Sequence, residues 1–98
     1  MLFAVIHTDR PGSLDLRMAT RPAHLTYAEA HAAKIVSGGA LLDADGRPAG
    51  SMLVIDVADR AEAEALVAID PYVKAGLFES SVIRPFRQVY KDGVKVAP

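Results

Sequence analysis

The chain has 98 residues, 51% of them apolar and 23% charged, which is enough for one folded domain with a small core. The net charge is −1 and Lys and Arg form no cluster, which argues against nucleic acid as a partner. There is no cysteine, and the N-terminal apolar run is too short for a signal peptide or a membrane span, so we expect a cytoplasmic protein without a membrane partner.

The first half of the sequence predicts a strand, a helix and two hairpin strands, over residues 2–7, 22–37 and 40–57. Pro22 is expected at the first helical position, where its missing N–H costs nothing, and the glycines after Ser37 would close the helix. Residues 13–20 allow a short helical turn. The pair Asp45-Gly46 is a strong signal for a hairpin turn.

The second half predicts a helix, a short turn or helical piece, a strand and a tail, over residues 59–70, 70–76, 77–90 and 91–98. Asp59 is a plausible N-cap of this second helix. Pro85 cannot donate a ladder hydrogen bond, so it favours an edge position or a bulge for the last strand.

The resulting order, β-α-β-β-α-β, is typical of the ferredoxin-like α+β fold in a single domain over residues 1–98. Such a domain has an antiparallel sheet with both helices on one face. The other face then needs a cover. Two sheets packed face to face in a homodimer would provide it, and the high apolar share for so short a chain agrees with this expectation.

His24 is the first candidate for chemistry, because it lies three residues into the expected helix. The positive end of a helix disfavours imidazolium, which would leave a neutral ring able to act as a general base. The alternative is an ordinary histidine at a helix start. Asp70 precedes Pro71 as an N-cap would. Its second oxygen could still accept the N–H of His24 and fix the tautomer, which requires a separation of about 3.2 Å or one bridging water.

Three further residues are candidates for substrate binding. Arg21 could hold an anionic oxygen, or it could be solvated or paired with an acid. Ser51 could offer its hydroxyl to a ligand, and Tyr72 could line the pocket beside Asp70 or pack its ring.

A metal centre is not expected. His31 follows His24 by seven residues, which separates the two by about 10.5 Å along a helix axis, and no cysteine is present. His31 is therefore expected to be solvated or to pack.

Three short motifs, in register across nearly the whole chain, carry a resemblance to a known family. They are Arg21-Pro22-x-His24-Leu25, Asp70-Pro71-Tyr72 followed by Ala75-Gly76, and Pro85-Phe86. Together they resemble the YCII-related family of small dimeric α+β barrel proteins. The resemblance implies a ferredoxin-like protomer, a dimer and a His–Asp pair in a cleft, here His24 and Asp70. Members often carry Gly-Pro after the second strand, whereas this chain has a short Asp45-Gly46 connection that would reshape one pocket wall.

The resemblance implies a small enzyme that uses His24 and Asp70 as an acid/base pair. The reaction would be an isomerisation or elimination on a small, possibly cyclic, organic substrate, with Arg21, Ser51 and Tyr72 binding that substrate and no cofactor. The alternative is a non-catalytic module of the same fold that binds a small ligand or supports a partner enzyme. A third interpretation makes the pair purely structural.

Overall fold

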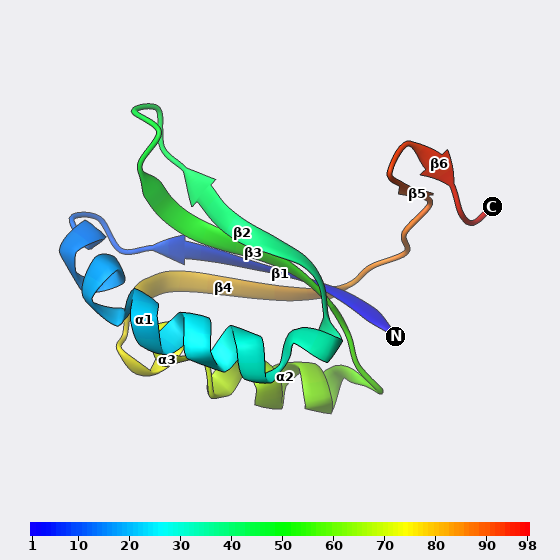
Figure 1. The fold of residues 1–98 in the computed structure, drawn as a ribbon, viewed down its shortest axis with the longest axis horizontal. Helices are drawn as coiled ribbons and strands as arrows, with labels where there is room; N and C mark the ends of the chain where they lie inside the picture. Colours follow the sequence, from blue (N-terminus) through cyan, green and yellow to red (C-terminus); the bar gives the residue numbers. More distant parts are fainter.

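The computed structural model describes residues 1–98 and contains one four-stranded antiparallel sheet (Figure 1). The strands lie in the order β2-β3-β1-β4, with bounds Leu2–Asp9 for β1, Ile35–Leu42 for β2, Pro48–Asp56 for β3 and Phe78–Pro85 for β4. The helices α1, α2 and α3 lie on one face of this sheet, with bounds Leu14–Ala30, Arg60–Ala68 and Pro71–Lys74. This arrangement is the ferredoxin-like α+β fold, as the sequence predicts.

The first helix differs most from the prediction, since it begins at Leu14 and holds Pro22 in its interior. A proline inside a helix costs roughly 3 kcal/mol, because one backbone hydrogen bond is lost and the ring crowds the preceding turn. Tertiary contacts on both sides of Pro22 compensate for this cost. Arg17 forms a buried ion pair with Asp9, and His24 bonds to Asp70. These two contacts hold the parts of α1 before and after Pro22 against the rest of the protein.

The glycines after Ser37 lie within β2 and do not close the helix, which ends at Ala30 and is followed by a 3₁₀ turn over Ala32–Lys34. Gly38 has a packing reason for being there. A Cβ atom at this position would lie 3.2 Å from the Leu53 side chain on the neighbouring strand. The prediction that these glycines close the helix is therefore wrong. Packing within the sheet explains why position 38 holds a glycine.

The remaining elements follow the prediction more closely. Asp59 caps α2 by accepting a hydrogen bond from the Glu62 N–H at 2.9 Å. Gly46 takes a φ of +80° in the β2–β3 turn. Pro85 ends β4, which is an edge strand, as expected. Beyond it the tail forms a two-stranded hairpin, with strands β5 (Tyr90–Lys91) and β6 (Val94–Lys95), that projects away from the sheet (Figure 1).

The core lies between the sheet and α2. It contains six buried apolar residues, namely Phe3, Val5, Ile55, Val57, Ala63 and Leu66. The opposite face of the sheet carries Met52, Ile6 and Val82, which lie side by side on β3, β1 and β4, respectively, and are 41–46% exposed. None of the helices has the length and apolar character needed to cross a lipid bilayer.

Candidate functional site

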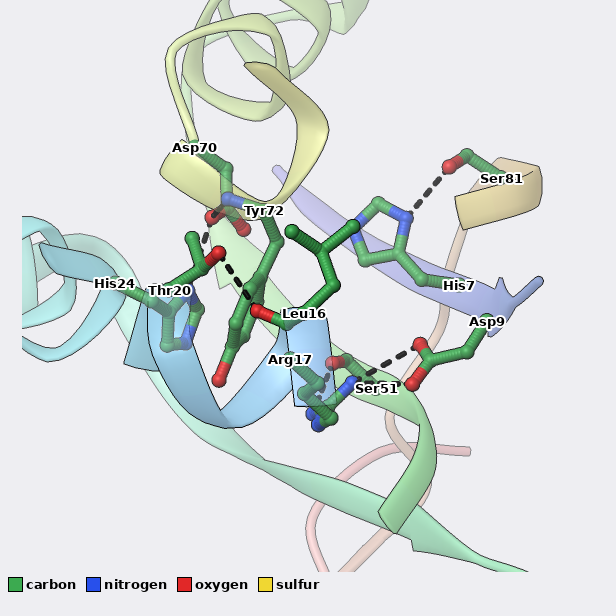
Figure 2. Close-up of polar contacts among 10 residues, drawn as sticks. All are labelled: His7, Asp9, Leu16, Arg17, Thr20, His24, Ser51, Asp70, Tyr72 and Ser81. Atoms are coloured by element: carbon green, nitrogen blue, oxygen red, sulfur yellow. Dashed lines mark hydrogen bonds and ion pairs between the residues drawn. The ribbon is translucent and has the colours of Figure 1, made fainter. Parts of the chain in front are cut away.

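His24 and Asp70 meet at the contact between α1 and the start of α3. The His24 Nδ1 atom lies 2.9 Å from Asp70 Oδ1, and the two side chains are 16% and 4% exposed (Figure 2). The same Oδ1 atom accepts the backbone N–H of Tyr72 at 2.9 Å. Asp70 therefore caps α3 and bonds His24 through a single oxygen, where the sequence suggested one oxygen for each role.

This hydrogen bond determines which ring nitrogen of His24 is free. An ionised carboxylate only accepts hydrogen bonds, so Nδ1 must carry the hydrogen that is donated to Asp70. In the neutral ring, Nε2 then keeps its lone pair and can accept a proton. The helix-dipole argument for a neutral His24 is wrong, because the residue lies in the middle of α1 and the dipole acts only within the first turn.

A pocket of about 260 Å³ lies beside His24, between α1 and the strands β2 and β3. Its polar lining comes from Arg17, Arg21, His24, Ser51 and Tyr72. Its apolar lining includes Leu25, Ala28, Ile35 and Leu53. Pockets for drug-sized ligands are typically about 300–1,000 Å³, so this one suits a smaller molecule.

The Tyr72 ring organises the polar side of this pocket. Its centroid lies 4.1 Å from that of the His24 ring in a stacked arrangement, and 4.7 Å from the guanidinium carbon of Arg17. Figure 2 shows the Tyr72 ring between these two side chains. Both are carried by α1, so one aromatic ring from α3 fixes the spacing of two pocket groups.

All five predicted site residues thus lie in one neighbourhood. Arg21, Ser51 and Tyr72 line the pocket with His24, and Asp70 lies behind the histidine. Ser51 is 4% exposed, and its Oγ accepts a hydrogen bond from Arg17 Nη2 at 2.9 Å. Arg21 is exposed and forms no ion pair with any acidic side chain.

Sequence reasoning missed the ion pair between Arg17 and Asp9. Arg17 Nη1 lies 3.0 and 3.2 Å from the two Asp9 oxygens, and both side chains are 6% exposed. The signal was present in the sequence. Arg17, Arg21 and His24 are spaced i, i+4, i+7, which places them on one face of one helix. Assigning the helix start to Pro22 hid this pattern.

His7 was also missed. It lies on β1, is 1% exposed, stacks on Phe78 with ring centroids 4.1 Å apart, and contacts Ser81 Oγ through Nδ1 at 2.6 Å. Burial lowers the pKa of His7 to about 4, because the charged ring would lose its hydration. It is therefore a neutral ring at physiological pH.

No group of three or more His, Cys, Asp or Glu side chains converges as a metal site would require. His31 lies at the end of α1, where its ring packs against Tyr27 with centroids 5.2 Å apart.

The fold and the pocket define a ferredoxin-like α+β protein with a histidine–aspartate pair beside a pocket. The model of the YCII-related domain matches residues 1–87, so the chain belongs to the YCII-related family. Protein YciI of Escherichia coli O6:H1 is 31% identical over 102 residues, which cover 92% of this chain and 100% of that protein. Protein YciI of Shigella flexneri matches to the same extent.

A solved structure is also similar along most of its length. It is 5-chloro-2-hydroxyhydroquinone dehydrochlorinase (TftG) from Burkholderia phenoliruptrix AC1100, in complex with 2,5-dihydroxybenzoquinone. The TM-score is 0.85 with 38% sequence identity, over 89% of this chain and 94% of that one. An antibiotic biosynthesis monooxygenase, at 13% identity and a TM-score of 0.51, shares the fold alone.

His7 makes the stability of the protein depend on pH. The pKa falls from 6.5 to about 4 on folding, so between these values the unfolded chain binds a proton that the native protein does not. Stability should therefore decrease as pH falls from 6.5 towards 4, by at most about 3 kcal/mol from this group. Urea unfolding across this range should show a shallower decrease for His7→Gln than for the parent. Parallel curves for the two proteins would contradict the assignment.

Proposed function

We propose that this chain is an enzyme in which His24 transfers a proton to and from a small cyclic, hydroxylated substrate. The observation that carries the proposal is the His24–Asp70 hydrogen bond, which engages Nδ1 and leaves Nε2 as the free nitrogen of a side chain that lines a pocket. The similarity to a dehydrochlorinase bound to 2,5-dihydroxybenzoquinone supports both the activity and the class of substrate.

The chemistry begins with the neutral His24 ring. Nε2 accepts a proton from a hydroxyl or an acidic ring carbon of the substrate, and the released electron pair moves into the substrate. The imidazolium that forms is stabilised by the Asp70 carboxylate at 2.9 Å. For elimination, a leaving group such as chloride departs with its bonding pair. For isomerisation, Nε2 returns the proton to another substrate atom.

Substrate oxygens become more negative during this proton transfer, and the pocket offers groups to meet them. Arg21 supplies a cation without an acidic partner. The Ser51 oxygen accepts from Arg17, so its hydroxyl hydrogen stays available for donation. We assign Arg21, Ser51 and Tyr72 to substrate binding, and His24 and Asp70 to proton transfer.

Two substitutions test the roles of the pair. His24→Gln should lower kcat roughly 10²- to 10⁴-fold, because the proton acceptor is lost. Asp70→Asn should lower kcat while α3 stays capped, because Asn caps a helix as well as Asp does. The assay is chloride release from 5-chloro-2-hydroxyhydroquinone, with circular dichroism to verify folding.

His31→Gln is the matched control, because His31 is on the same helix but does not line the pocket. It should retain parental activity. Unchanged turnover in His24→Gln would exclude His24 as the acid/base group, and binding without turnover in the parent would favour a ligand-binding module.

We further propose that two copies pack through the open faces of their sheets. Ile6 pairs in register with Met52 and Val82 across three strands, and all three side chains face away from the helices. Burial of apolar surface gives roughly 25 cal/mol per Å², so a continuous apolar face favours association with a second one.

Ile6→Lys should place a charge at the centre of this face and shift the protein to monomer in analytical ultracentrifugation. Met18→Lys is the control, because Met18 is 52% exposed on α1. It should leave the assembly unchanged. A parent protein that sediments as a monomer, or equal effects of both substitutions, would rule out this interface.

A further inference from the structure

Tyr72 is a buried residue whose hydroxyl no protein group binds. The residue is 2% exposed, and its hydrogen bonds are made by its backbone alone, whose N–H donates to Asp70 and whose carbonyl oxygen accepts from Leu77. The side chain lines the pocket, and Figure 2 shows the hydroxyl at the end of the ring that points away from Asp70. No buried side-chain oxygen or nitrogen lacks a hydrogen-bond partner, so this unpartnered hydroxyl is open to the pocket and is available to a ligand there.

Tyr27 shows what a structural tyrosine looks like in the same protein. It is a half-buried residue of α1, and its hydroxyl donates to the Leu66 carbonyl oxygen at 2.6 Å. Tyr27 thereby joins α1 to α2 and does not line the pocket. Both phenol rings lie near the His24 ring, with centroids 5.9 Å (Tyr27) and 4.1 Å (Tyr72) from it. Of these two residues, only Tyr72 has a hydroxyl without a hydrogen-bond partner.

The Tyr72 hydroxyl is held in its donor form. Burial raises the pKa of Tyr72, so the group keeps its hydrogen at neutral pH. The guanidinium of Arg17 lies 4.7 Å from the ring centroid and draws electron density from the phenol. Both effects favour donation of a hydrogen bond to an electron-rich oxygen.

The charges around the pocket favour an anion. Arg17 is balanced by Asp9, and Asp70 is engaged by His24 and the start of α3. Arg21 has no acidic partner and no carboxylate lines the pocket, so an anion there meets a cationic surface. Its apolar lining and stacked rings suit a flat molecule.

We infer that the Tyr72 hydroxyl donates a hydrogen bond to an anionic oxygen of a planar ring, and that the pocket selects enolates or phenolates over neutral phenols. This inference rests on the proposed function, because it names the substrate class of the same site.

The experiment measures the affinity of two probes at pH 7 by isothermal titration calorimetry. They are 2,5-dihydroxybenzoquinone, whose acidic hydroxyls are ionised, and neutral hydroquinone. The parent should bind the anionic probe at least about 10-fold more tightly. Tyr72→Phe keeps the ring and its stacking but should bind that probe roughly 10- to 100-fold more weakly, with an unchanged melting temperature. Tyr27→Phe should show the reverse, with parental affinity and a lower melting temperature.

Equal affinity of the parent and Tyr72→Phe for the anionic probe would overturn the role of the hydroxyl. Equal affinity of the parent for both probes, or no binding of either, would overturn the proposed substrate class. Chloride release and its loss in His24→Gln are measured separately, so failure of this inference is distinguishable from failure of the acid/base function.

Discussion

One hydrogen bond, from His24 Nδ1 to Asp70 Oδ1, is the contact on which the proposed chemistry depends. It joins α1 to the start of α3, and the 2.9 Å separation determines the tautomer of the imidazole. The accepting oxygen also holds the backbone N–H of Tyr72. The cap that begins α3 therefore also orients the histidine and places the tyrosine ring against it. The cap of α3 and the proposed chemical role of Asp70 use the same oxygen atom, and Asp70→Asn is expected to separate them.

Buried charge around the pocket is arranged in pairs, and this explains how so small a domain can hold it. A single buried charge is expensive, whereas a pair with additional hydrogen bonds is tolerated. Arg17 satisfies Asp9 with one nitrogen and Ser51 with another, and its cationic face covers Tyr72. The strands thus supply Asp9 and Ser51, and α1 supplies the arginine between them.

The sequence predicted the element order, the β2–β3 hairpin and the cap at Asp59 because these features depend on local chemistry. It also pointed to His24 and Asp70 as neighbours, through motifs that resemble a family. The prediction places the start of α1 at Pro22, because a proline favours the first helical turn, and so passes over the i, i+4, i+7 spacing of Arg17, Arg21 and His24 that indicates the longer helix. The burial of His7 could not be predicted from the sequence. Its burial comes from stacking on Phe78 of a distant strand, which no spacing pattern reveals.

The tautomer of His24 shows whether Nδ1 donates a hydrogen bond to Asp70 in solution. Two-dimensional ¹H–¹⁵N NMR on histidine-labelled protein distinguishes a protonated ring nitrogen from an unprotonated one, and loss of a signal set in His24→Gln assigns the ring. The neutral ring should carry its hydrogen on Nδ1, with Nε2 unprotonated, as the contact with Asp70 requires. A neutral ring with its hydrogen on Nε2 would mean that Nδ1 does not donate to Asp70 and that Nε2 has no lone pair for the proposed proton transfer.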